Sequence, residues 1–149
     1  MKKEINWSKY LVIGFFAVGI IAMTLNSFLP GKDDIKDIEL TDSGIALPSF
    51  SKEAMVGKQL FDMNCVVCHG RNASGTEQGP PLIHRIYNPG HHSDRAFYLA
   101  VGNGAKQHHW PFGDMPPQPQ VSSEQVSRII RYVRELQEAN GIAYQKHQM

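Results

Sequence analysis

The sequence has almost no net charge and therefore no broad positive field. Its 149 residues include 15 basic and 14 acidic side chains, for a formal net charge of +1. Because a nucleic-acid-binding surface must neutralise phosphates, this balance argues against a nucleic-acid partner. The chain also has no strong strand signal, and its length leaves room for one small domain plus an appendage.

Cysteine is scarce: the chain has 2, in Cys65-Val66-Val67-Cys68-His69. A structural zinc site normally takes four ligands in two spaced pairs, and a thioredoxin-like redox pair needs a βαβ pattern that is absent. Two cysteines at this spacing followed by histidine are typical of c-type haem attachment. Each thiol can bind one vinyl group while the imidazole reaches the iron. A plain disulfide or a chance spacing is the alternative.

Charge is also missing from Tyr10 to Leu29, a run of about 20 residues that is long enough to cross a bilayer core. Three lysines precede this run, so the basic excess predicts a cytoplasmic N-terminus and places everything after Pro30 outside. No small-x-small site ends the run, and the chain has neither a twin-arginine pair nor a cysteine for a lipid anchor. We therefore expect an uncleaved transmembrane anchor over residues 1–30; the alternative is a removed secretory signal.

Residues 31–50 are acidic, contain glycine and proline, and show no sustained apolar period. This composition predicts a flexible linker between the anchor and a domain over residues 51–149. Alternatively, the part around Ile45 to Leu47 packs along the domain.

The domain pattern predicts three helices joined by long loops. Ser51 begins the first helix, whose apolar face leads to Cys65. Ser93 begins a short helix that ends at 102–104, and Ser122 caps a strongly amphipathic last helix. Three helices would bury only a thin core, so we expect an all-α fold wrapped around its cofactor, with stability that depends on it.

These residues resemble the class I c-type cytochrome family over nearly all of residues 51–141. The matching positions are Gly57, Phe61, Cys65, Cys68 and His69; Gly79, Pro80, Pro81 and Leu82; Met115 and Pro116; and Ile129 and Tyr132, with isoleucine where the family has leucine. The resemblance implies that Gly57 allows the first and last helices to cross closely and that Phe61 and Tyr132 pack at the crossing.

The resemblance also implies a ligand set for one covalent haem c. Cys65 and Cys68 would bind it covalently, and His69 would be the proximal axial ligand, its Nδ1 hydrogen accepted by the carbonyl of Pro80. Leu82 belongs to the same loop. Met115 is the expected distal ligand, because a thioether favours ferrous iron and fills the sixth position.

Other loop residues are candidates for the cofactor site. Trp110 and Arg85 are expected to bind the haem propionates, with Arg95 as an equal choice and packing over the haem edge as the alternative for Trp110. Histidine ligation instead of Met115 stays open, because five histidines lie in the loops: His84, His91, His92, His108 and His109.

Together these features predict a membrane-anchored monohaem cytochrome that carries single electrons between respiratory redox partners. It would sit in a bacterial cytoplasmic membrane with the haem domain on the outer side. It would be an electron carrier rather than an enzyme. The alternatives are a subunit fixed in a larger oxidase or dehydrogenase complex, and a haem enzyme or gas sensor with a displaceable distal ligand.

Covalent haem attachment requires both thiols, so we expect Cys65→Ala or Cys68→Ala to reduce assembly of the haem protein severely. Denaturing electrophoresis with haem staining measures the attached haem directly. Haem that acidified organic solvent extracts from the native protein would contradict this prediction.

Overall fold

A computed structural model describes residues 38–146 of the chain. The elements are β1 (Glu39–Leu40), β2 (Ala46–Leu47), α2 (Lys52–Asn64), α3 (Val66–His69), η2 (Arg71–Ala73), η3 (Arg85–Tyr87), α4 (Asp94–Asn103) and α5 (Ser123–Ala139). The predicted anchor over residues 1–30 lies outside the described residues. Within 38–146 no helix has the length and apolar character that a membrane span needs.

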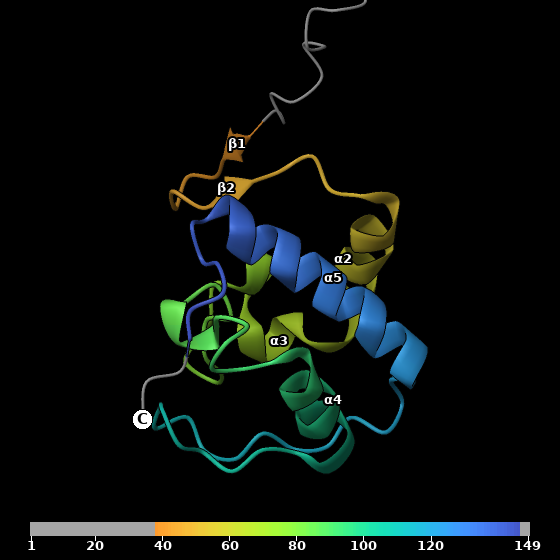
Figure 1. The fold of residues 1–149 in the computed structure, drawn as a ribbon. Coiled ribbons are helices and arrows are strands. Elements are labelled where there is room, and N and C mark those ends of the chain that lie inside the picture. The colour runs from red at the N-terminus through yellow and green to blue at the C-terminus, as the bar shows by residue number, and fades with distance from the viewer. Residues whose placement is uncertain (1–37, 147–149) are drawn as a thin grey trace, which may run out of the picture. The chain divides into compact units, whose positions relative to one another are not determined.

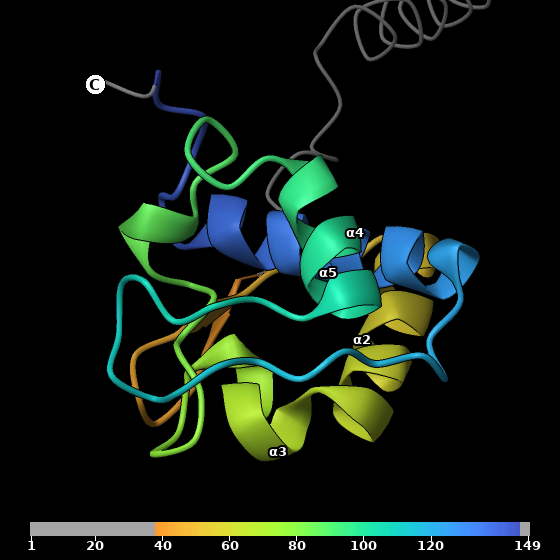
Figure 2. The same ribbon diagram turned by 90° about the horizontal axis from the view of Figure 1, so that it is seen from below.

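Helices α2 and α5 cross in close contact, as Figures 1 and 2 show. Gly57 lies at the crossing, where a Cβ atom would overlap the carbonyl oxygen of Arg128 and lie 3.1 Å from Cβ of Tyr132. The rings of Phe61 and Tyr132 pack beside it with centroids 5.5 Å apart, and both side chains are fully buried. The close crossing expected at Gly57 is therefore confirmed.

Helix α5 supplies more residues to the apolar core than any other element. Ser122 and Gln125 form the expected capping box at its start. Its buried apolar stripe consists of Val126, Ile129, Ile130, Tyr132, Val133 and Leu136. This spacing puts every member on one face of the helix, so α5 is held mainly by burial of that face.

Two polar residues near the end of α5 tie it to the loop that follows η2. Gln137 is fully buried, and its Nε2 donates to the carbonyls of Leu82, at 2.7 Å, and Tyr87, at 3.1 Å. Arg134 donates to the carbonyls of Tyr87, at 2.9 Å, and His92, at 2.5 Å. Residues 82–92, which include the short helix η3, are thereby fixed against α5, because these donors satisfy their carbonyls.

The segment before α2 differs from the prediction. Residues 38–50 include a two-stranded antiparallel hairpin, with Leu40 paired to Ala46, although the sequence shows no strand signal. Ile45 is buried, and Asn140 exchanges hydrogen bonds with Ala46 at 2.9 and 3.0 Å. From Ile45 onward the chain packs on the domain, as in the alternative considered for this segment, because α5 offers its backbone a polar partner.

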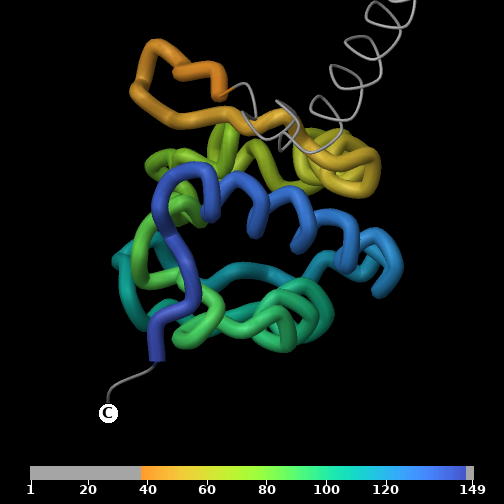
Figure 3. Tube along the Cα trace, turned by 45° about the horizontal axis from the view of Figure 1, so that its top comes forward, coloured from red at the N-terminus to blue at the C-terminus, as the bar shows by residue number. Residues whose placement is uncertain are grey.

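Helix α4 and two long loops cover the other side of the molecule. Residues 104–121 run as an extended excursion below α4 in Figures 1 and 2. The stretch after α5 turns back past residues 88–90, as Figure 3 shows, and Gln145 donates through its N–H to Asn88 Oδ1 at 3.3 Å. This return brings the C-terminal part of the described chain against the loop that precedes α4.

We expect Gly57→Ala to lower the free energy of unfolding by about 3 kcal/mol, because the new methyl group must push α5 away through its rigid backbone. Denaturant unfolding of the haem-loaded protein measures the change. Gly102→Ala is the matched control: Gly102 lies in α4 with open space around its Cβ position. There alanine should be neutral or stabilising by up to about 1 kcal/mol. Equal effects of the two substitutions would contradict the close crossing.

Candidate cofactor site

A cavity of about 380 Å³ lies between the crossing helices, α4 and the excursion over residues 104–121. Its wall is mainly apolar and includes Phe61 and Ile129 from the helix crossing and Phe97 from α4. A volume of this size is within the range of small-molecule and cofactor sites. The crossing of α2 and α5 therefore supplies one wall of the cavity as well as the core.

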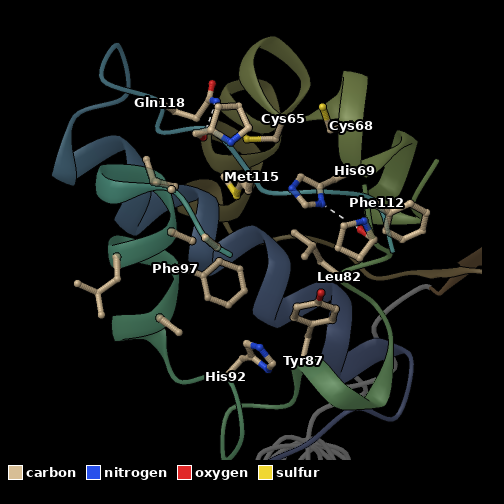
Figure 4. Close-up of a pocket in the computed structure, with 18 of the residues that line it drawn as sticks. Cys65, Cys68, His69, Leu82, Tyr87, His92, Phe97, Phe112, Met115 and Gln118 are labelled. Atoms are coloured by element: carbon tan, nitrogen blue, oxygen red, sulfur yellow. Dashed lines mark hydrogen bonds between the residues drawn. The ribbon is translucent and has the colours of Figure 1, made fainter. Parts of the chain in front are cut away.

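The cysteine–histidine motif lines this cavity. Helix α2 ends at Asn64, Cys65 follows, and the single turn of α3 carries Cys68 and His69. Figure 4 shows the imidazole of His69 directed into the cavity between the cysteines and Leu82. The structure contains no disulfide between the two cysteines. Two thiols and one imidazole thus share one wall, an arrangement that can hold a haem covalently and ligate its iron.

His69 has a fixed tautomer. Its Nδ1 lies 2.9 Å from the carbonyl oxygen of Pro80, and since a carbonyl only accepts, Nδ1 carries the hydrogen. The pKa of His69 is lowered by burial, although the hydrogen bond to Pro80 opposes this shift. The imidazole is therefore neutral near pH 7, with the lone pair of Nε2 available to a metal.

The loop that carries Pro80 is held close to α3. A Cβ atom at Gly79 would lie only 2.8 Å from the carbonyl oxygen of Cys68, so glycine is needed at this position. Thr76 donates through its hydroxyl to the same carbonyl at 2.6 Å. These contacts explain why a Gly-Pro pair ten residues beyond the motif can reach the histidine.

The thiol of Cys65 is poorly ionised in this environment. Burial, together with smaller effects of the nearby Cys68 and Asp62, raises its pKa to about 11. Both cysteines are half-buried and line the cavity wall. The thiol of Cys65 consequently faces an apolar space as a neutral group, as a site for a large apolar ring requires.

Met115 enters the same cavity from the excursion over residues 104–121 (Figure 4). Its backbone pairs with Ala105, through N–H···O distances of 2.8 and 3.0 Å. Lys106 and Asp114 form an ion pair at 2.5 Å next to that pairing. The backbone pairing and the ion pair together hold the two strands of the excursion next to each other at Met115. These contacts fix the position of Met115 in the cavity.

Trp110 provides a test of whether the cavity fits a haem. Its indole Nε1 is buried without a hydrogen-bond partner, and the residue lines the cavity. Leaving such a donor unsatisfied costs about 1–3 kcal/mol, so the site calls for an acceptor from a bound group. A carboxylate of a haem propionate is an acceptor of this kind, and the residues present fit the cofactor.

The remaining predicted residues divide between the wall and the surface. Leu82 is buried and lines the cavity. Arg85 and Arg95 are exposed and do not line it, so the structure gives no support for a propionate contact by either. Arg85 begins the single turn of η3 and is exposed, whereas Tyr87 ends the same turn and is buried.

Tyr87 and Phe97 line the cavity but were not among the predicted site residues, and His92, named only as an alternative iron ligand, lines it too. Burial raises the pKa of Tyr87, and Trp110 interacts with its hydroxyl but falls short of hydrogen-bond geometry. The guanidinium of Arg134 lies 4.9 Å from the ring centroid of Phe97. No local pattern marks these positions, because contacts from α5 bring them to the cavity.

The histidines considered as alternative axial ligands lie in two groups. His84 accepts a hydrogen bond from the N–H of Ile86 through Nδ1 at 3.3 Å and does not line the cavity. The other four, His91, His92, His108 and His109, contact one another. Met115 shares the cavity wall with three of these histidines, His92, His108 and His109, whose rings also contact one another.

Comparisons with known proteins identify a family for the chain. The family model described as "Cytochrome c" matches residues 54–137. The chain is 31% identical over 107 residues to the cbb3-type cytochrome c oxidase subunit CcoP of Rhodobacter capsulatus, which covers 70% of this chain and 35% of that protein.

Two further relatives are cytochrome bc1 complex cytochrome c subunits. The one from Corynebacterium diphtheriae is 30% identical over 133 residues, covering 80% of this chain and 40% of that protein. The one from Corynebacterium efficiens is 28% identical over 157 aligned positions, with coverages of 97% and 43%. The chain thus spans less than half the length of each of these relatives. No solved structure gave a significant match.

If the sulfur of Met115 ligates iron, the oxidised protein should show the weak far-red band of a thioether-bound ferric haem. Met115→His should remove this band and lower the reduction potential, because imidazole stabilises ferric iron relative to thioether. Met115→Ala should let the ferrous protein bind carbon monoxide.

Met63→Ala is the matched methionine control for this prediction, because Met63 lies in α2 with 70% of its surface exposed. It should leave the band and the potential unchanged. If Met115→Ala leaves both unchanged while His109→Ala alters them, a bis-histidine site replaces the methionine ligand.

Proposed function

The chain belongs to the cytochrome c family, and from that membership we propose that it is a membrane-anchored monohaem cytochrome in respiratory electron transfer. It would pass single electrons between redox partners on the outer side of a bacterial cytoplasmic membrane. The relatives named above are subunits of respiratory complexes, which supports a role in such a chain.

The observation that carries this proposal is the ligand set around one cavity. Cys65 and Cys68 would hold the haem covalently, and His69, kept neutral and oriented by Pro80, would ligate its iron from the same wall. The haem would supply an iron that cycles between the ferrous and ferric states. Since the chain has only one pair of cysteines, we propose one haem per chain.

Met115 gives the site the character of a carrier rather than a catalyst. A thioether from the opposite side of the cavity would fill the sixth position and keep oxygen or peroxide from the iron. The paired backbone at Ala105 and the ion pair at the base of the excursion hold this residue in place. A haem enzyme or gas sensor needs a ligand that leaves easily, so this arrangement favours electron transfer.

Trp110 and Leu82 would complete the site. The unsatisfied indole N–H of Trp110 would donate to a propionate, and Leu82 would pack against the ring from the Pro80 loop. The mainly apolar wall would exclude water from the iron, which keeps reorganisation small when the charge of the iron changes.

The second candidate is a subunit fixed inside a larger oxidase or dehydrogenase complex. The names of the relatives favour it, since these are an oxidase subunit and subunits of the bc1 complex. In this case the apolar run over Tyr10 to Leu29 would serve assembly as well as anchoring. The chemistry at the haem would be the same in both cases.

Native membranes that carry the untagged full chain test both the anchor and the electron transfer. After an alkaline carbonate wash, the haem-stained band should remain with the membrane, because the apolar run is long enough to span it. Intact mass should equal the full chain plus one haem. A respiratory substrate should reduce the haem, and oxygen should then reoxidise it.

Different results separate the alternatives. A mature N-terminus near residues 26–31 would show that the segment is a removed signal. Migration with a large complex after mild detergent extraction would favour the integrated subunit. Rapid binding of carbon monoxide by the reduced native protein would overturn the carrier assignment in favour of an open haem site.

A further inference from the structure

Four histidines from two distant loops form a cluster next to the cofactor cavity. His91 and His92 precede α4, whereas His108 and His109 lie in the excursion over residues 104–121. The Nε2 atoms of His91 and His109 are 3.2 Å apart, and those of His92 and His108 are 3.4 Å apart. One ligand atom from each of His91, His92 and His109 lies within 4.8 Å of the other two.

The tautomers of two members are fixed by backbone contacts. Nδ1 of His92 lies 2.9 Å from the carbonyl oxygen of Ile86, and Nδ1 of His108 lies 2.7 Å from that of Lys106. Because a carbonyl only accepts, each Nδ1 carries the hydrogen and each Nε2 presents a lone pair when the ring is neutral. Two lone pairs that face each other at 3.4 Å repel, so the pair calls for a cation between them.

Protonation is a poor source of that cation. Burial lowers the pKa of His92 and the neighbouring histidines lower it as well, although the hydrogen bond to Ile86 opposes the shift; this ring is neutral near pH 7. The pKa of His109 is lowered by burial and by the adjacent His108 and His91. A metal-ligating histidine commonly donates its other ring N–H to a backbone carbonyl, as His92 and His108 do here.

The nitrogen separations fit one coordination geometry. Zinc binds histidine nitrogen at about 2.0–2.1 Å, so neighbouring ligand atoms of a tetrahedral site lie about 3.3 Å apart. The His91–His109 contact, at 3.2 Å, and the His92–His108 contact, at 3.4 Å, are close to that separation, while the ligand atoms of His91, His92 and His109 all lie within 4.8 Å of one another. A square-planar ion with bonds of similar length would bring adjacent nitrogens to about 2.8–2.9 Å, which is shorter than either contact.

The two loops that carry the cluster are held in place by other parts of the fold. Arg134 donates to the carbonyl of His92 at 2.5 Å, and Asn88 accepts hydrogen bonds from the N–H groups of Gly90 and His91. The Lys106–Asp114 ion pair closes the base of the other loop. The histidines therefore start close together before any ion is bound, which reduces the ordering that binding requires.

We propose that His91, His92 and His109 bind a divalent transition-metal ion with the tetrahedral preference of zinc, separate from the haem iron. His108 is placed to occupy the fourth position next to His92. Imidazole nitrogen suits Zn²⁺ among the common divalent ions. The proposal does not depend on the haem assignment, because none of its ligands belongs to the haem ligand set.

The test uses the untagged, haem-loaded full chain, stripped with a chelator and titrated with Zn²⁺ alone. Calorimetry should show one saturable site per chain. X-ray absorption at the zinc edge should show at least three imidazole nitrogens at about 2.0–2.1 Å. The zinc absorption edge is separate from that of the haem iron, so the zinc measurement can be interpreted even if the haem assignment fails.

His91→Ala and His109→Ala should each weaken Zn²⁺ binding by at least about 100-fold. His84→Ala is the matched control, because His84 lies in the preceding loop outside the cluster, and it should leave binding unchanged. The haem absorption spectrum checks that each variant is folded.

Absence of a saturable site in the wild-type chain would overturn the proposal. So would a zinc shell with fewer than three imidazoles, or equal affinities of the cluster variants and the wild type. If the wild-type chain has no saturable site and a His92→Ala variant loses haem, His92 belongs to the cofactor site instead.

Discussion

The close crossing of α2 and α5 at Gly57 is the contact on which the rest of the structure depends. With no side chain at this position, the backbones approach until Phe61 and Tyr132 pack at the crossing. Phe61 then forms a wall of the cavity, and the end of α2 delivers Cys65 to its edge. A separation of the helices would therefore displace the core and the attachment site together.

Buried polar groups extend this order from the helices into the loops. Gln137 and Arg134 donate from α5 to carbonyls of Leu82, Tyr87 and His92, which lie in segments with little regular structure. Burying such donors is costly unless every hydrogen bond is made, so the network favours one arrangement of the loop over all others. That arrangement places Tyr87 on the cavity wall and His92 in the histidine cluster.

The excursion over residues 104–121 serves both proposed sites. The pairing of Ala105 with Met115 near its base helps to place the Met115 thioether on the wall of the cavity that His69 also lines. Its tip carries His108, His109 and Trp110. A metal ion held by the histidine cluster would link this tip to the loop before α4. The link would stabilise the side of the cavity that contains the unpaired indole N–H of Trp110.

The sequence by itself determined the three main helices, the motif at Cys65, Cys68 and His69, and Met115 as a cavity residue, because caps, apolar periodicity and close ligand spacing are local properties. It indicated neither the hairpin before α2 nor Tyr87 and Phe97 as wall residues. It predicted that Arg85 contacts a haem propionate, whereas in the structure Arg85 is exposed and does not line the cavity. It also gave no sign that four of the five histidines it offered as alternative iron ligands contact one another. Only the tertiary structure decided these points, because they depend on contacts between α5 and loops some 40 to 100 residues away, which leave no periodic trace in the chain.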